Sequence, residues 1–128
     1  MGVAEKLLRE GRSVRLCVMG DVPGQELDPF TRYRWIGILH GLGVELIAHV
    51  RLSGASNGTV LFKHVASLAP VVCENVDTLV LAQSHRPLNE LEDALAQFTG
   101  DVYPIGDCRT PRTAEEAVYE GLMVGLGV

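Results

Sequence analysis

Short apolar runs alternate with helical segments along most of this chain, and this alternation constrains the fold more than any other feature. The expected strands cover residues 13–19, 44–49, 51–53, 59–64, 71–73, 77–82 and 101–105, and the expected helices cover 3–9, 29–42, 87–97 and 113–126. Strands that alternate with helices favour an α/β fold with a mostly parallel sheet. The run at 77–82 (Asp-Thr-Leu-Val-Leu-Ala) is the strongest strand prediction.

Local stop and start signals support several of these elements. Asp28-Pro29 is typical of a helix N-cap followed by proline at the first helical position, and Gly43 is placed to end that helix. Asn57-Gly58 supplies two residues that tolerate positive φ, so the runs on either side predict a small antiparallel hairpin. The sequence therefore predicts one α/β domain over residues 1–128.

Composition narrows the classes of function. The 128 residues are 47% apolar and 21% charged, with a net charge of −5 and no basic run, so nucleic-acid binding is not expected. No apolar stretch is long enough to cross a membrane, and the start does not resemble a signal peptide. Three widely spaced cysteines suit reduced thiols rather than a disulfide framework, which favours a cytoplasmic protein.

The segment 103–121 carries the chemistry that the sequence reveals. An apolar strand leads into Gly106-Asp107, a proline-containing turn follows, and a helix is expected to begin near Thr113. Glycine allows close approach of a ligand to the backbone, and a helix start presents N–H groups and a positive dipole end. The Asp107 carboxylate can accept a hydrogen bond from a sugar hydroxyl. This pattern suits a nucleotide diphosphate, although a plain structural turn has the same residues.

The order of elements resembles the C-terminal region of the NADH:flavin oxidoreductase group that includes trimethylamine dehydrogenase and 2,4-dienoyl-CoA reductase. Its most specific part is Ile105-Gly106-Asp107 with Pro111-Arg112, followed by Ala117 and Gly121; Ala4-Glu5-Lys6-Leu7 with Gly11 matches as well. The resemblance covers nearly the whole chain. It implies a Rossmann-like three-layer sandwich, with residues 1–84 similar to the inner NAD(P)-type fold and 85–128 to the returning FAD-type segment.

Parts of that family's pattern have no counterpart in this sequence. The resemblance implies an FMN-binding barrel and an iron–sulfur cluster in a parent enzyme, whereas Cys17, Cys73 and Cys108 are too few and too scattered to hold a cluster. The first strand and the Gly-rich loop that cradles a pyrophosphate are missing, and Gly2 is the only remnant. Ala82-Gln83-Ser84 stands where relatives often have Ala-Thr-Gly.

Five residues are candidates for binding FAD, ADP or NAD(P)H, namely Gly106, Asp107, Arg112, Thr113 and Asp21. The resemblance implies that Asp107 contacts the ribityl or ribose–diphosphate region; otherwise it caps the turn. Arg112 either faces a phosphate or pairs with Glu115 or Glu116. Asp21 follows a strand, where an acidic residue can bind a ribose 2′-hydroxyl, but it also suits a turn.

No catalytic or metal site is expected in this chain. The four histidines, His40, His49, His64 and His85, lie on separate elements without metal-ligand spacing.

Two functions remain open. The chain is either the nucleotide-binding part of an oxidoreductase that is not catalytic alone, beside a catalytic barrel subunit, or a ligand-free interaction module. In the second case identical chains complete the sheet as a homodimer.

Overall fold

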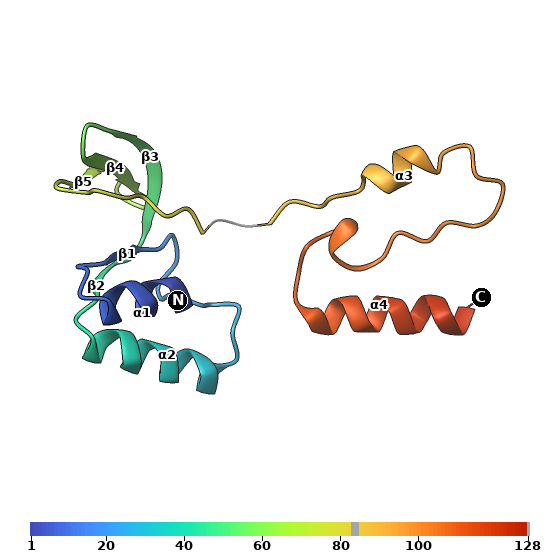
Figure 1. Ribbon diagram of the computed structural model, residues 1–128, viewed down its shortest axis with the longest axis horizontal. Helices are drawn as coiled ribbons and strands as arrows, with labels where there is room; N and C mark the ends of the chain where they lie inside the picture. Colours follow the sequence, from blue (N-terminus) through green and yellow to red (C-terminus); the bar gives the residue numbers. More distant parts are fainter. Residues whose placement is uncertain (83–84, 128) are drawn as a thin grey trace. The chain divides into compact units, whose positions relative to one another are not determined.

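The computed structural model describes residues 1–82 and 85–127, which form two compact units, Met1–Val80 and Leu81–Val128 (Figure 1). The departure from the family pattern at Gln83 and Ser84 lies outside the described residues. The division of the chain near residue 84, like its description as one α/β domain, stays a prediction.

Two helices of the first unit confirm their local signals. Helix α1 spans Gly2–Arg9 and α2 spans Pro29–Gly41, and the two helices contact each other. The Asp28 carboxylate accepts a hydrogen bond from the Thr31 N–H at 3.0 Å, which satisfies one of the free donors at the start of α2. Gly43 follows the helix at φ +80°, the left-handed conformation that glycine adopts without a steric cost.

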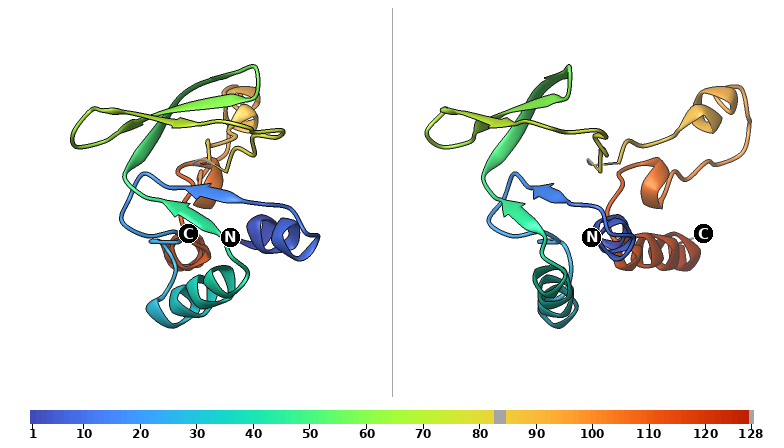
Figure 2. Two further views of the ribbon diagram at one scale, coloured as in Figure 1. Left: turned by 90° about the vertical axis from the view of Figure 1, so that its left-hand side faces the viewer. Right: turned by 60° about the vertical axis from the view of Figure 1, so that its left-hand side comes forward.

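The strands of the first unit form two small sheets. Strands β1 (Arg15–Cys17) and β2 (Glu45–Ile47) pair in parallel, and α2 connects them. Strands β3 (Val50–Ser56), β4 (Thr59–His64) and β5 (Pro70–Cys73) form an antiparallel sheet in that order. The β3–β4 turn has Asn57 and Gly58 at positive φ, as the hairpin prediction requires. In two views α1 and α2 lie on the side of the parallel pair that faces away from the antiparallel sheet (Figures 1 and 2).

The buried core belongs to the first unit. Val50, Val60, Phe62 and Cys73 form a cluster in the antiparallel sheet, and Cys17 and Ile47 from the parallel pair pack against it. Leu39 of α2 is 1% exposed. The strands and helices of Met1–Val80 are thus held together by apolar contacts between their facing surfaces.

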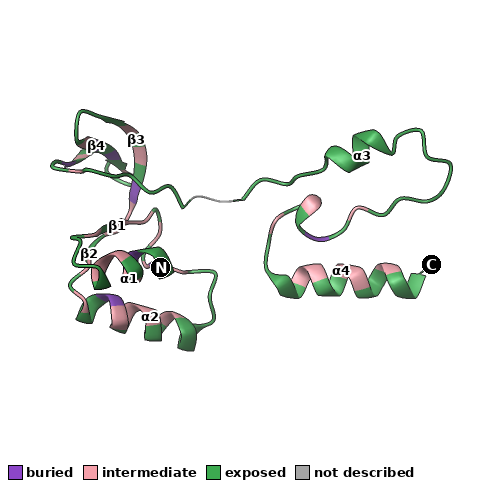
Figure 3. Cartoon of the chain, viewed as in Figure 1, coloured by how far each residue is buried: buried purple, intermediate pink, exposed green. Residues whose placement is uncertain are grey.

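The second unit contains helix α3 (Glu90–Ala94), the 3₁₀ turn η1 (Gly106–Cys108) and helix α4 (Ala114–Gly127). Figure 3 shows that α3 is exposed along its length and that α4 carries only intermediate and exposed residues. Gly106 is the one buried residue among the described residues of this unit. This unit therefore buries almost no apolar surface of its own.

Two predicted strands are wrong, and one predicted helix is confirmed only in part. Residues 77–82 and 101–105 form no strand, and only Glu90–Ala94 of the predicted helix 87–97 is helical. Nor do the described residues form a three-layer sandwich with a mostly parallel sheet, because the larger sheet is antiparallel. Short turns bring β3, β4 and β5 together locally, whereas a parallel strand needs neighbours that are distant in sequence. What the structure establishes is a mixed α/β fold.

Candidate functional site

The candidate site is the turn that joins η1 to α4, and Gly106 determines its shape. Gly106 is buried and has φ +66°, a conformation that side chains with a Cβ rarely adopt. A Cβ at this position would lie 3.3 Å from the Ala117 Cβ, which is tighter than ordinary van der Waals contact. A Cβ at Gly121 would lie 3.8 Å from the Ile105 Cδ1. Small residues on one face of α4 therefore let the helix pack closely against this turn.

The Glu120 carboxylate contacts two donors of this turn, the Gly106 N–H and the Arg112 guanidinium. Its Oε2 accepts a hydrogen bond from the Gly106 N–H at 2.7 Å, and its Oε1 pairs with the Arg112 guanidinium. The Gly106 N–H, more than the Arg112 cation, holds the pKa of Glu120 below its usual value. The carboxylate thus takes the place that a bound anion would take beside Arg112.

The start of α4 is capped from within the chain. The Thr113 N–H donates to Glu116 Oε2 at 3.0 Å, and the Thr113 hydroxyl donates to the same oxygen. The hydroxyl hydrogen bond is the main cause of a lowered pKa for Glu116. This is the reciprocal half of a capping box, in which a glutamate in the first turn satisfies the N–H before the helix.

The structure brings four of the five candidates, Gly106, Asp107, Arg112 and Thr113, into this one turn. Asp107 lies in η1 and is exposed, and its carboxylate makes no hydrogen bond to another described residue. Asp21 belongs to the Met1–Val80 unit, where its Oδ1 lies 3.6 Å from the His49 Nδ1. Binding of a nucleotide by any of the five stays a prediction.

Sequence reasoning missed the two glutamates that organise the turn. The sequence offers Glu115 or Glu116 as an ion-pair partner for Arg112, but among the described residues Arg112 pairs with Glu120. The Thr-x-x-Glu spacing from Thr113 to Glu116 is a capping-box signal that could have revealed the second contact. The bond from Gly106 to Glu120 spans fourteen positions and has no comparable local signal.

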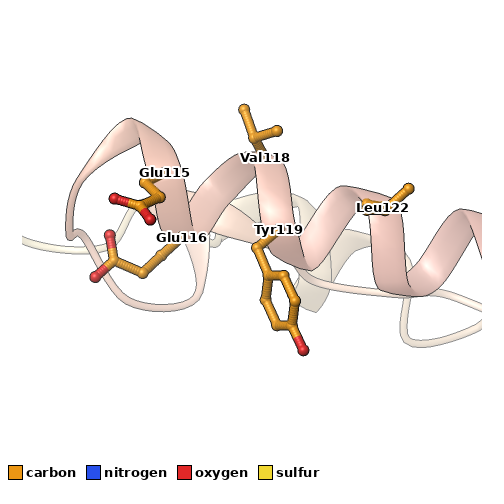
Figure 4. A pocket seen from close by; sticks show the side chains of 5 residues that line it. All are labelled: Glu115, Glu116, Val118, Tyr119 and Leu122. Atoms are coloured by element: carbon orange, nitrogen blue, oxygen red, sulfur yellow. The ribbon is translucent and has the colours of Figure 1, made fainter.

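A hollow on α4 lies beside the turn but does not enclose a ligand. Its lining consists of Glu115, Glu116, Val118, Tyr119 and Leu122. All five side chains come from one helix and extend from its surface (Figure 4). An open helix face of this kind lacks the surrounding walls that most small-molecule sites have.

Cys17 and Cys73 lie together in the core of the first unit, whereas Cys108 belongs to the second unit. Burial, with a further contribution from Cys73, raises the pKa of the Cys17 thiol to about 11. Cys73 is buried in the core cluster, and the Cys108 thiol donates to the Ile105 carbonyl at 2.9 Å.

Within residues 1–82 and 85–127, no group of three His, Cys, Asp or Glu side chains is placed to hold a metal ion. None of the helices in the described part is long and apolar enough to cross a membrane.

The fold has counterparts among solved structures of oxidoreductases. Over 98% of its length the chain matches 2-naphthoyl-CoA reductase in complex with 2-naphthoyl-CoA (22% identity, TM-score 0.77). Over 96% it matches the 6-hydroxypseudooxynicotine amine oxidase of Pseudomonas geniculata N1 (22%, 0.79), and over 95% the histamine dehydrogenase of Rhizobium sp. 4-9 (20%, 0.81).

The chain covers 19%, 19% and 20% of these three proteins, respectively, so it spans about a fifth of each. At these identities the likeness concerns the fold. No protein-family model matches the sequence, and no curated protein sequence matches it.

Proposed function

We propose that this chain is the nucleotide-binding part of an FMN- and iron–sulfur-dependent oxidoreductase of the NADH:flavin oxidoreductase group, without a catalytic centre of its own. The observation that carries this proposal is the fold match over 95–98% of the chain to a reductase, an amine oxidase and a dehydrogenase. The names of these enzymes specify chemically different substrates. A segment with the same fold in all three is better suited to a shared cofactor than to the choice of substrate.

The ligand of this part is an adenine or flavin nucleotide, with FAD, ADP and NAD(P)H as the candidates. The exposed Asp107 carboxylate is free to accept a hydrogen bond from a ribose or ribityl hydroxyl. Arg112 and the N–H of Thr113 are the donors for a phosphate, and Asp21 is a second hydroxyl acceptor in the first unit.

The phosphate side of the turn fits this ligand less well than the sugar side. Glu120 already holds the Gly106 N–H and Arg112, and Glu116 holds the Thr113 N–H. A diphosphate can use these donors only when the two carboxylates move away, because like charges at this distance repel. The proposal therefore requires that the side chains of Glu116 and Glu120 change their rotamers when a nucleotide binds.

The redox chemistry of the proposed enzyme belongs to the FMN and the iron–sulfur cluster of a parent protein or a barrel subunit. Four cysteine thiolates usually hold such a cluster. Here Cys17 and Cys73 lie in one unit and Cys108 in the other, and no fourth cysteine exists. The reduced thiols favour a cytoplasmic location.

Substitution at Asp107 tests the ligand assignment. We expect ADP to bind the wild-type chain in a calorimetric titration and Asp107→Ala to abolish that binding, because the substitution removes the hydroxyl acceptor. Asp101→Ala is the matched control, since Asp101 is also an exposed aspartate of the same unit but lies before the turn. An ADP affinity that is unchanged in Asp107→Ala would contradict the assignment.

A second candidate function is a ligand-free interaction module, which the exposed apolar surface favours. Val118, Leu122 and Leu126 of α4 are 72%, 56% and 74% exposed. A partner such as a catalytic barrel subunit could cover this helix face. Absence of bound nucleotide, together with a stable complex of defined mass, would favour this function over the first.

A further inference from the structure

Two of the three cysteines lie side by side in the core of the first unit, although they are far apart in the sequence. Cys17 is the last residue of β1, and it packs against the apolar cluster that contains Cys73, the last residue of β5. After burial, the neighbouring Cys73 thiol is the largest cause of the raised pKa of Cys17, through its charge and a hydrogen bond between the two side chains. The two thiols are therefore in direct contact.

A second contact holds β1 next to the end of β5. The guanidinium of Arg15, two positions before Cys17 on β1, donates a hydrogen bond to the Glu74 carbonyl at 2.6 Å. Residues two positions apart on a strand lie on the same face, so Arg15 and Cys17 both face the end of β5. Both cysteines belong to the unit Met1–Val80, so their contact is internal to one compact body.

Contact between two thiols is the arrangement from which a disulfide forms. Such a bond joins side chains whose Cβ atoms lie about 4 Å apart. Cys17 is half-buried and Cys73 is buried, so Cys17 is the thiol that a small reagent meets first. Cys108 differs from both, because it belongs to the other unit and its thiol donates to the Ile105 carbonyl.

We propose that Cys17 and Cys73 are a redox-sensitive pair, which a low-molecular-weight disulfide such as oxidised glutathione converts into an intramolecular disulfide. The proposal does not depend on nucleotide binding. In a cytoplasm the pair is reduced under ordinary conditions, because the thiol pool there keeps cysteines reduced, and the bond forms when that pool becomes oxidised.

The reaction consists of two thiol–disulfide exchanges. The Cys17 thiolate attacks one sulfur of oxidised glutathione, whose S–S bond breaks, and one glutathione leaves as its thiolate. The Cys73 thiolate then attacks the Cys17 Sγ in the mixed disulfide, and the second glutathione leaves. The two protons of the protein thiols pass to the two glutathione thiolates, so the protein loses two electrons and oxidised glutathione gains them. Because the pKa of Cys17 is about 11, little thiolate exists at neutral pH and the first exchange is slow.

The new bond would join the parallel pair of strands to the antiparallel sheet. About 55 residues separate Cys17 from Cys73, and a cross-link that closes a loop of this length restricts the unfolded chain. The urea midpoint of the first unit should therefore rise by about 2 M or more on oxidation. Reduction with dithiothreitol should return the midpoint to its original value.

Oxidation of the full chain by oxidised glutathione, followed by peptide mapping without reductant, tests the pairing. A pH of about 9 gives a measurable rate, because more of the Cys17 thiol is ionised there. We expect the intact mass to fall by two hydrogen atoms and one cross-linked peptide pair to contain Cys17 and Cys73. In the urea-unfolded chain the selectivity should be lost, and all three possible pairings should appear.

Two variants separate this bond from other oxidation. Cys108→Ser is the matched control, and it should form the same bond with the same gain in urea midpoint. Cys17→Ser should form no intramolecular disulfide. Fluorescence of Trp35, in α2, verifies that each variant keeps the fold of the first unit, and the mapping of the wild-type chain stands without them.

Several results would each overturn the proposal. One is a folded wild-type chain whose thiols stay free or stop at the mixed disulfide with glutathione. Others are a cross-link that involves Cys108, a Cys17–Cys73 bond that leaves the urea midpoint unchanged, and loss of that bond in Cys108→Ser.

Discussion

Truncation of Leu39 to alanine should destabilise the first unit severely. Leu39 lies in α2 with 1% exposure and is the one large side chain among the described residues that is fully buried. A Leu→Ala change at such a site costs about 2–5 kcal/mol, which includes the cavity that it leaves. A unit of 80 residues has a total stability of about 4–12 kcal/mol. Leu39→Ala therefore removes a large share of the stability or unfolds the unit.

Urea denaturation followed by Trp35 fluorescence measures this loss, since the chain has one tryptophan and it lies in the same helix. With a slope of about 1 kcal/mol per molar urea, the midpoint should fall by about 2 M or more. Leu61→Ala on β4 is the control, because Leu61 is 45% exposed and its truncation should cost less than about 1 kcal/mol. Equal midpoints for the two variants would refute the description of the core.

Two further predictions concern titrating groups. The Thr31 hydrogen bonds lower the pKa of Asp28, so Asp28 stabilises α2 above pH about 4, and this contribution is lost as the pH falls through the lowered value. Asp28→Asn should keep the cap and lose this pH dependence of helix content, measured by circular dichroism, whereas a wild-type pH profile in the variant would contradict it. Burial raises the pKa of Cys17 from 9.0 to about 11, so its alkylation by iodoacetamide near pH 8 should be about a hundredfold slower than in the urea-unfolded chain. Peptide mass spectrometry measures that rate, and similar rates in both states would show that the thiol is accessible and ionised.

Elements with local signals could be predicted from the sequence, and elements that need distant partners could not. The Asp28-Pro29 start of α2 and the Asn57-Gly58 hairpin each depend on a few neighbouring residues, and both are confirmed. The runs at 77–82 and 101–105 have strand-like composition but are unpaired in the described structure. Composition can indicate that a run is able to pair, but the ladder also requires a second strand.

The same distinction applies to the candidate site. Gly106 has a positive φ, which explains why the turn needs glycine at this position. The Gly106-Asp107 dipeptide is therefore important for the local fold. Glu120, whose carboxylate accepts the hydrogen bond from the Gly106 N–H, lies in the second turn of α4, and Ala117 of the same helix lies against Gly106. Glu120 is distant in sequence from Gly106 and Arg112, so no local pattern predicts its contacts with them.

A calorimetric titration of the purified, colourless wild-type chain with ADP tests the central proposal most directly. The account predicts saturable binding in the micromolar range, about −8 kcal/mol. Such binding would mean that the Gly106-Asp107 turn accepts a nucleotide once Glu120 moves aside. Trp35 fluorescence verifies that the first unit is folded. If such a folded chain gives no heat of binding, the result contradicts the nucleotide-binding function.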